Sequence, residues 1–401
     1  MKEGMGGTMT PELIDVDLIG RLKRTLAGWM PEFQSDLAWL VARDRGSEHK
    51  AGVDAAAEWM LGKLENLGCE TVTYPSEDYG MAVAGSLKGR GQGRALLVAH
   101  LDTVWPVQTA AGWPLRIEGT RAMGPGVVDN ASGSLAGYYA LKALQAVEYD
   151  DFAEIALLCN GDEEVGSPFS KEVIRALAQG RDAALILEAP SNPDEIISQR
   201  AGLMYYDLRV NGRNAHAGVE PEKGHNAIEE LCLKLNACQE IARDSEVLTV
   251  SVATIEGGQR PNIVPDYARA EIDVRVETVQ EAELVNAHFR AVADRVWVAG
   301  TSAALSGGMS HPPMERGPQS PRLVATAQAI GRVLGVDLKD TFCGGTSDGC
   351  YSAVAGTPTL CGLAPYGALY HTRDEYLELS TVVPRTALIA GLAASCGPRP
   401  D

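Results

Sequence analysis

Short apolar runs alternate with helical stretches along the first half of the chain. Residues 95–98, 155–159 and 183–187 are continuous apolar runs, which are typical of strands buried on both faces of a parallel sheet. Helical periodicity covers residues 11–70, which include the amphipathic run 54–67 ended by Gly68, and residues from about 129 to 147. This alternation predicts an α/β domain, with a mixed, mostly parallel sheet and helices on both faces.

The pattern changes from about residue 201. In Tyr267–Val276, alanine, isoleucine and valine alternate with charged residues, which predicts a strand with one buried face. The other elements expected in this region are strands over 203–210 and 247–255, helices over 227–241 (with Asn226 as N-cap) and 279–292, and a short strand near Ala303. The order βαββαβ predicts a ferredoxin-like two-layer α+β unit.

Helical and buried-strand patterns resume at residue 320 and continue to the end. One domain is therefore predicted to be split along the chain, with the ferredoxin-like unit inserted into it. We assign residues 1–200 and 316–401 to the split domain and residues 201–315 to the inserted domain.

Composition and charge exclude several classes of partner. The chain has 401 residues, of which 45% are hydrophobic, as expected of a globular protein with more than one core. Lys and Arg number 35 against 53 Asp and Glu, which gives a net charge of −18 and argues against nucleic acid or an anionic membrane as partner. No apolar run approaches the roughly 20 residues of a membrane span, and the first residues lack a signal-peptide core. We expect a cytoplasmic protein.

The cysteines do not point to a metal site or a disulfide scaffold. Eight cysteines in 401 residues are too few for such a scaffold, and none forms a C-x-x-C pair. Most lie in apolar surroundings such as ALLCN and TLCGL, where a free cysteine packs as a small buried residue. We therefore place none of them on a metal.

Histidines and carboxylates gather where the apolar runs end, and the carboxyl ends of strands are where α/β sheets build their sites. These residues are His100 and Asp102, Asp129 after a Gly-Pro-Gly turn, Glu163 and Glu164, Glu188, and His371 near the end of the chain. Two histidines with several carboxylates suit zinc, with manganese and cobalt as alternatives. A two-metal site needs a bridging carboxylate, and a spare carboxylate to move the proton of an activated water. The Glu163-Glu164 pair can supply a ligand and a base.

Eight short motifs follow one another along the chain. They are His100-x-Asp102, GPGVVD, DEEVGS, LEAP, NAHAGVEPEKGHNA, RPNIVP, GGTSDG and the late His371. Together they resemble the clan MH metallopeptidases of the aminoacylase and carboxypeptidase G type, a group that includes acetylornithine and succinyl-diaminopimelate deacylases. The resemblance runs from about residue 35 to the end. It implies that 1–200 and 316–401 form a zinc-peptidase-like catalytic domain and that 201–315 form a dimerisation (lid) domain.

The same resemblance implies a role for each residue of the metal site. Asp129 would bridge two divalent metal ions in each subunit, most readily zinc. His100 and Glu188 would complete one metal site, and Glu164 and His371 the other. Glu163 would be the general base and then the acid, and Asp102 would orient His100. The Asp129-Asn130 peptide bond is expected to be cis, as the equivalent bond is in relatives.

Residues outside the metal site are assigned from the resemblance as well. His216 would reach into the active site of the partner subunit of a homodimer and stabilise the oxyanion. Asn262 and Arg275 match substrate-contacting positions, although Arg275 also suits the solvated face of its strand. Gly345 and Thr346 belong to a loop that would offer backbone N–H groups to a substrate carboxylate.

Two segments depart from the pattern of these relatives. Asn130-Ala131 stands where the bridging Asp is often followed by Met or Asp and then Lys, which alters the charge near the metals. Ser310-His311-Pro312-Pro313 lacks the Arg that precedes a Pro in glutamate-releasing relatives. The second departure weakens the case for glutamate as the released product.

Two classes of function follow. The first is a dinuclear metal hydrolase that cleaves an amide next to a carboxylate, as a carboxypeptidase G-like peptidase or an N-acyl amino acid deacylase. A variant of it uses the same site on an unusual C–N bond, in an aryl amine or a carbamoyl group. The second class is a non-catalytic binding relative, which we rank lower because Glu163 and all the expected ligands are present.

Overall fold

A computed structural model describes residues 14–397 of the chain. The chain divides into two compact units. Unit 1 comprises Met1–Gln199, Arg316–Phe342 and Ser347–Asp401, and unit 2 comprises Arg200–Glu315 and Cys343–Thr346. Residues 1–13 of the predicted split domain, and with them the first residues of the helical prediction for 11–70, lie outside the described residues.

Unit 1 is built around a six-stranded sheet in the order β1-β2-β6-β3-β7-β16. Neighbours from β6 to β16 run parallel, whereas β1 and β2 form an antiparallel edge. The bounds are β1 (Glu70–Tyr74), β2 (Ala82–Lys88), β3 (Arg94–His100), β6 (Glu154–Asn160), β7 (Ala183–Ile186) and β16 (Thr359–Leu360). The three apolar runs are therefore the central strands β3, β6 and β7, as predicted.

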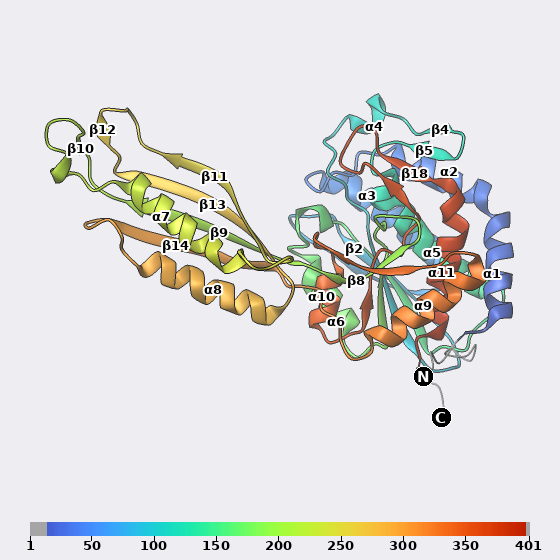
Figure 1. Ribbon diagram of the computed structural model, residues 1–401. Helices are drawn as coiled ribbons and strands as arrows, with labels where there is room; N and C mark the ends of the chain where they lie inside the picture. Colours follow the sequence, from blue (N-terminus) through green and yellow to red (C-terminus); the bar gives the residue numbers. More distant parts are fainter. Residues whose placement is uncertain (1–13, 398–401) are drawn as a thin grey trace, which may run out of the picture. The chain divides into compact units, whose positions relative to one another are not determined.

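Helices cover both faces of this sheet (Figure 1). Leu97 joins a large core formed with helices such as α5 and α11, while its neighbours Leu96 and Val98 are equally buried on the opposite face. Helices α6 and α10 pack against β3 and β7. The helix bounds are α1 (Val16–Gly28), α2 (Met30–Val41), α3 (Lys50–Asn66), α4 (Thr109–Gly112), α5 (Gly133–Ala146), α6 (Ser170–Ala178), α9 (Ser320–Leu334), α10 (Gly349–Val354) and α11 (Val382–Ser395). This arrangement confirms the predicted α/β class.

The predicted helical region 11–70 is interrupted between α2 and α3. Residues 45–47 instead pair with Thr103 after β3: the backbone N–H of Thr103 donates to the carbonyl of Arg45 at 2.8 Å, and that of Ser47 donates to the carbonyl of Thr103 at 3.1 Å. This pairing is non-local, so helical periodicity alone could not show it.

Smaller sheets complete unit 1. One has the order β17-β18-β5-β4 and joins the loop after Met123 to the region of His371. Another pairs β15 with β8, strands whose residues belong to unit 1 except for the last one of each. The bounds are β4 (Arg116–Glu118), β5 (Arg121–Met123), β8 (Glu195–Arg200), β15 (Lys339–Cys343), β17 (Gly367–Ala368) and β18 (Tyr376–Glu378).

Unit 2 is the expected ferredoxin-like layer of helices on an antiparallel sheet (Figure 1). Its four strands follow the order β11-β13-β9-β14, and α7 and α8 pack against them around a separate core. The bounds are β9 (Gly202–Asn211), α7 (Ala227–Gln239), β11 (Thr249–Gly257), β13 (Tyr267–Val276), α8 (Val279–Asp294) and β14 (Ser302–His311), with a two-stranded ribbon of β10 (Ala215–His216) and β12 (Ile263–Val264). Asn226 caps α7 by accepting from the N–H of Glu229, as predicted.

A buried ion pair ties the helices of unit 2 together. Lys234 and Glu230 are 1% and 0% exposed, and their charged atoms lie 3.1 Å apart. Lys234 also donates to the carbonyls of Val292, Ala293 and Arg295 at the end of α8. Each charge is therefore both paired and hydrogen-bonded, which offsets the cost of its burial.

We expect Lys234→Met to destabilise the protein by about 3–5 kcal/mol, because it leaves Glu230 as an uncompensated buried charge. The free energy of unfolding in urea, followed by circular dichroism, measures this loss. Lys223→Met is the control: Lys223 is exposed and pairs with Glu220 on the surface, so its removal should cost about 0–1 kcal/mol. Equal effects of the two substitutions would contradict the prediction.

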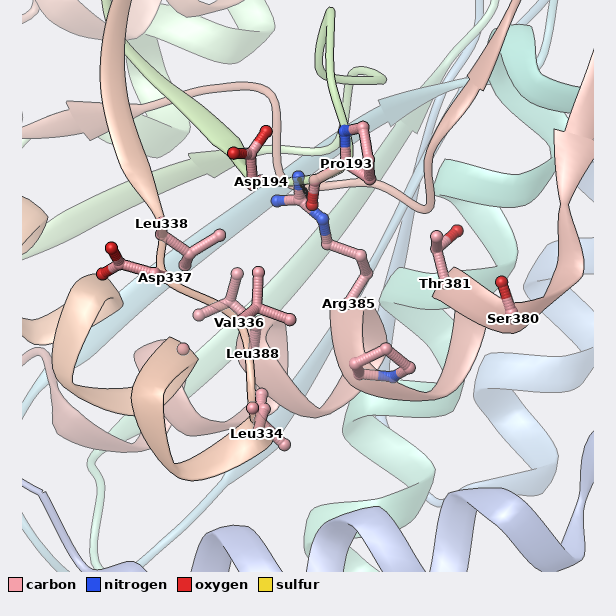
Figure 2. Close-up of a pocket in the computed structure, with 13 residues that line it drawn as sticks. Pro193, Asp194, Leu334, Val336, Asp337, Leu338, Ser380, Thr381, Arg385 and Leu388 are labelled. Atoms are coloured by element: carbon pink, nitrogen blue, oxygen red, sulfur yellow. Dashed lines mark hydrogen bonds between the residues drawn. The ribbon is translucent and has the colours of Figure 1, made fainter.

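A second buried cation lies in unit 1. Arg385 is 3% exposed and donates to the backbone carbonyls of Gly362, Pro193 and Glu195 at 2.7–3.2 Å. It lines a pocket of about 430 Å³ whose apolar wall is formed by Leu334, Val336, Leu338 and Leu388 (Figure 2).

None of the helices between residues 14 and 397 has the length and apolar character that a membrane span requires.

Candidate metal centre

The carboxyl end of β3 brings the first histidine into a buried acidic site. His100 is 1% exposed, and its Nδ1 lies 3.2 Å from Oδ1 of Asp102. Asp102 is itself fully buried and accepts from the hydroxyl of Ser47 at 2.7 Å. Since Nδ1 is engaged by Asp102, the Nε2 atom is the one available as a ligand.

Asp129 lies between the two histidines with one carboxylate oxygen directed at each. Its Oδ1 is 3.1 Å from Nε2 of His100, and its Oδ2 is 3.1 Å from Nε2 of His371. Residues 127–132 form a turn before α5, and within it Asp129 and Asn130 have non-helical dihedral angles. The peptide bond between them is cis, as predicted. The turn therefore presents a carboxylate that could bridge two ions.

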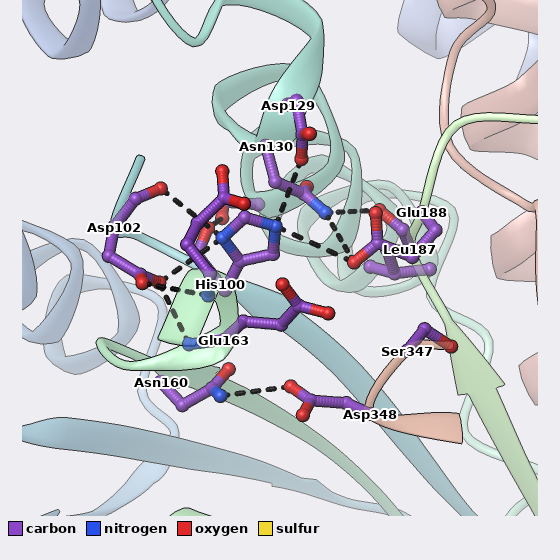
Figure 3. A network of polar contacts seen from close by, with 12 residues as sticks. His100, Asp102, Asp129, Asn130, Asn160, Glu163, Leu187, Glu188, Ser347 and Asp348 are labelled. Atoms are coloured by element: carbon purple, nitrogen blue, oxygen red, sulfur yellow. Dashed lines mark hydrogen bonds and ion pairs between the residues drawn. The ribbon is translucent and has the colours of Figure 1, made fainter. Parts of the chain in front are cut away.

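Asn130, which departs from the pattern of relatives, contacts the predicted ligand Glu188. Its Nδ2 donates to the carbonyl of Leu187 at 2.9 Å and to Oε1 of Glu188 at 3.2 Å (Figure 3). Oε1 of Glu188 lies 3.5 Å from Nε2 of His100. Space here is tight, because a Cβ on Gly133 would lie only 1.9 Å from Oδ1 of Asn130. The asparagine thus fixes Glu188 beside His100.

Asp102 also holds the turn that carries the two adjacent glutamates. Its Oδ1 and Oδ2 accept from the backbone N–H groups of Glu163 and Glu164 at 3.2 and 3.1 Å. Gly166 ends this turn with φ 89°, a conformation that glycine adopts without strain. Figure 3 shows the side chain of Glu163 extending below His100, toward Glu188. One carboxylate anchor therefore positions both a histidine ligand and the predicted base.

The second histidine comes from the loop between β17 and β18. Nε2 of His371 lies 3.3 Å from Oε2 of Glu164, and its side chain is 50% exposed. Four residues later, the buried Glu375 accepts from the N–H groups of Gly126, Val128 and Asp129 at 3.0–3.2 Å. Glu375 thus ties the loop of His371 to the loop of Asp129. The sequence predictions omitted it.

The electrostatics follow from burial and from the acid–histidine contacts. Burial alone would raise the pKa of Asp129, but contacts with His100 and His371 outweigh it and hold that pKa well below its usual range. Hydrogen bonds to Asp129 and Glu164 raise the pKa of His371 to about 10. Burial raises the pKa of Glu163 well above its usual range and that of Glu164 to about 7. The site therefore carries protons that cations could replace.

The residues present fit two divalent cations. Ligand atoms of His100, Asp129 and Glu164 all lie within 4.8 Å of one another. Oε1 of Glu164 is buried and has no hydrogen-bond partner within residues 14–397, which leaves a lone pair for a cation. Asp129 has one oxygen for each half of the site, and each half adds one histidine and one glutamate. Nitrogen and carboxylate donors in this mixture suit zinc and related ions.

A buried polar network continues from this site. Asp348, from the GGTSDG motif, accepts from Nδ2 of Asn160 at 2.9 Å and from the hydroxyl of Ser167. Burial raises its pKa to about 7. Figure 3 shows Asp348 and Asn160 below Glu163. The sequence predictions did not include these two residues in the site.

The other predicted residues belong to unit 2. His216 lies in β10, and Ala217 beside it donates to the carbonyl of Asn262 at 3.0 Å, so the structure brings these two motifs together. His216 is exposed, and its Nδ1 accepts from the N–H of Gly218 at 3.1 Å. That contact places the proton of a neutral imidazole on Nε2, where it can be donated.

Arg275 and the glycine-rich loop also meet within unit 2. The Nε and Nη2 atoms of Arg275 pair with Asp273 at 2.9 and 3.0 Å, and its Nη1 donates to the carbonyl of Gly344 at 3.5 Å. Arg200, which the sequence predictions omitted, donates to the carbonyls of Gly345 and Thr346 at 3.1 and 3.4 Å. Two arginines therefore hold the carbonyls of this loop.

Comparison with known proteins identifies the family. The model of peptidase family M20/M25/M40 matches residues 96–395, which is most of the chain. The chain belongs to this family. It is a hydrolase of the peptidase and amidohydrolase type, and the resemblance inferred from the motifs is confirmed.

Relatives of this M20 family member span nearly its whole length. It is 31% identical over 379 residues to carboxypeptidase G2 of Pseudomonas sp. (strain RS-16), covering 92% of this chain and 90% of the relative. It is 26% identical to succinyl-diaminopimelate desuccinylase of Gluconobacter oxydans, covering 84% and 91%. The solved structure of Bacillus subtilis YXEP, a dinuclear metal-binding peptidase of the M20 family, superposes with a TM-score of 0.69 at 15% identity, covering 92% and 98%. The structural similarity to YXEP supports the fold described above.

Proposed function

We propose that this family member is a dinuclear metal-dependent hydrolase that cleaves an amide bond next to a carboxylate. The observation that carries the proposal is the placement of Asp129, whose two oxygens face the Nε2 atoms of two different histidines. We assign His100 and Glu188 to one ion and His371 and Glu164 to the other, with zinc as the expected metal and manganese or cobalt as alternatives. The named relatives, a carboxypeptidase and a desuccinylase, support an amide substrate.

Two cations held by these residues would lower the pKa of a bound water and polarise the scissile carbonyl. Glu163 takes the proton from the attacking water and passes it to the nitrogen of the leaving amine. Asp102 keeps His100 in the tautomer that leaves Nε2 free, and it fixes the backbone of Glu163. His216 donates from Nε2 to the oxyanion that forms at the carbonyl.

We expect the substrate to be a small molecule with a carboxylate, such as an N-acyl amino acid or a short peptide. Asn262, Arg275, Gly345 and Thr346 are our candidates for contacting it. We also propose that the enzyme is a homodimer, with 201–315 as the dimerisation domain and 1–200 with 316–401 as the catalytic domain. A cytoplasmic location stays a prediction from the sequence.

Metal analysis combined with a substrate panel tests this function. We expect two zinc ions per chain after zinc loading, and hydrolysis of N-acyl amino acids or short peptides detected through the released amine. Dialysis against a chelator should abolish turnover, and added zinc should restore it, because the proposed reaction needs the ions to activate water and to polarise the carbonyl. Full turnover in the metal-free protein would contradict the proposal. A zinc-loaded protein inactive on a broad panel of amides, aryl amines and carbamoyl compounds would favour a binding role.

A further inference from the structure

Arg45 is a buried cation next to the metal ligands that has no role in the proposed reaction. It lies between α2 and α3 and is only 1% exposed. Its Nε donates to the carbonyl of Leu40 at 3.1 Å, and its Nη1 donates to the carbonyl of Leu101. Leu101 stands between His100 and Asp102, so the guanidinium is anchored to the segment that presents the first ligand.

The backbone around Arg45 strengthens this anchorage. The backbone of residues 45–47 pairs with Thr103, and the hydroxyl of Ser47 donates to Asp102 at 2.7 Å. The position of Arg45 is therefore fixed by the same contacts that fix Asp102.

Carboxylates that orient or form the proposed site lie near enough to the guanidinium to act on its charge. The acidic groups that act most strongly on Arg45 are those of Asp102, Glu375 and Glu164, in that order. Its Nη2 lies beside Gly126, where an added Cβ would be 3.3 Å away, and Gly126 donates to Glu375 at 3.0 Å. Burial lowers the pKa of Arg45 to about 10, so the group stays charged at neutral pH.

The free donor on Arg45 indicates that packing alone does not account for the residue. Among the described residues its Nη2 has no hydrogen-bond partner, and Oε1 of Glu164 is a buried acceptor without one. A buried charge that lacks a partner for one of its donors is unfavourable by itself, and an apolar side chain of similar size would fill the space at a lower cost. The charge is therefore expected to act on its surroundings.

We propose that Arg45 is a positioning residue for the metal centre. Its guanidinium anchors the carbonyl of Leu101, and its fixed positive charge balances the buried carboxylates of Asp102 and Glu375, so that the ligands are oriented before metal binds. This inference rests on the dinuclear site of the proposed function. Arg45 touches neither substrate nor metal ligand atoms in this role and acts through Asp102 and Glu375.

A matched control exists elsewhere in unit 1. Arg385 is also almost fully buried, but it is held by backbone carbonyls, and the acids that act on it are Asp194 and Glu195 rather than those of the metal centre. Arg385→Met therefore removes a buried guanidinium of the same size without touching the acidic site.

The test measures zinc affinity without any substrate. Metal-free wild-type protein and the variants Arg45→Met, Arg45→Gln, Arg45→Lys and Arg385→Met compete for zinc with a chromophoric chelator, after circular dichroism has shown that each is folded. We expect both neutral variants to bind zinc about 10–100-fold more weakly, as when a group that orients a ligand is lost. Arg45→Lys should recover most of the affinity, and Arg385→Met should stay within about threefold of wild type. Arg45→Gln retains a donor for the carbonyl of Leu101, so its zinc affinity reports the effect of losing the charge alone.

The direction in which zinc affinity changes distinguishes a positioning role from simple electrostatic repulsion between Arg45 and the metal ions. A charge that acted only through space would repel incoming cations, so its removal would tighten zinc binding. Wild-type or tighter affinity in the neutral variants would overturn the proposal, as would an Arg45→Lys variant as weak as Arg45→Met. Equal losses in Arg45→Met and Arg385→Met would overturn it too. A wild-type chain that binds no zinc would instead contradict the proposed metal centre itself.

Discussion

Replacing Glu163 by glutamine is expected to lower turnover by several orders of magnitude, on the order of 10³-fold, while leaving metal content and fold unchanged. The amide has almost the same volume as the carboxylate but cannot take a proton from water and return it to the leaving amine. The backbone N–H of Glu163, not its side chain, makes the contact with Asp102, so the turn should keep its shape. Steady-state kinetics of the zinc-loaded variant, with zinc measured in the same sample, gives the result.

Glu164 provides the comparison that makes the assignment of Glu163 as the base specific. Oε2 of Glu164 lies 3.3 Å from Nε2 of His371, so Glu164→Gln removes a proposed ligand and should lose zinc along with activity. Glu172→Gln, on the exposed face of α6, should behave as wild type. If Glu163→Gln keeps a tenth of the activity at full zinc content, the base has been assigned to the wrong carboxylate. If it loses zinc, Glu163 is a ligand.

Local pattern was enough to predict the elements that are regular over their whole length. The alternation in Tyr267–Val276 delimits β13 at both ends, and the three apolar runs are the central strands of the sheet. The signal failed where a segment takes its conformation from a distant partner. Residues 45–47 pair with Thr103, and this pairing lies in the break between α2 and α3 that periodicity over residues 11–70 did not predict.

The proposed metal centre could be outlined from sequence because its candidate ligands stand at the ends of strands and in characteristic motifs. The groups that hold those ligands could not, since their burial is created by loops far apart in the chain. Arg45 lies within the region predicted as helical and in none of the eight motifs, yet it is 1% exposed and donates to the carbonyl of Leu101, next to His100. Glu375 reads as one acid among several, yet it accepts from three backbone N–H groups of the loop that carries Asp129.

His216→Ala is expected to lower turnover by about 10²- to 10³-fold with zinc content unchanged, because it removes a donor to the developing oxyanion. The imidazole is poised for this role, since Gly218 donates to Nδ1 at 3.1 Å and leaves the proton on Nε2. Unit 2 carries His216, whereas every proposed metal ligand lies in unit 1, so the substitution should not disturb the metals. His288→Ala is the control in the same unit: its Nε2 contacts the carbonyl of Ala237 at 2.8 Å, a packing role, and activity should be retained.

Mixing two inactive variants then tests whether His216 acts across the proposed homodimer. In a mixed dimer of His216→Ala and Glu163→Gln subunits, action in trans gives one site with both Glu163 and His216 intact and one site with neither. Such a dimer should recover up to half of the wild-type activity. If His216 acted within its own subunit, each site would keep one defect and no activity would return. Subunit exchange is verified with differently tagged chains, so that an inactive mixture with proven exchange would place His216 in its own subunit or outside catalysis.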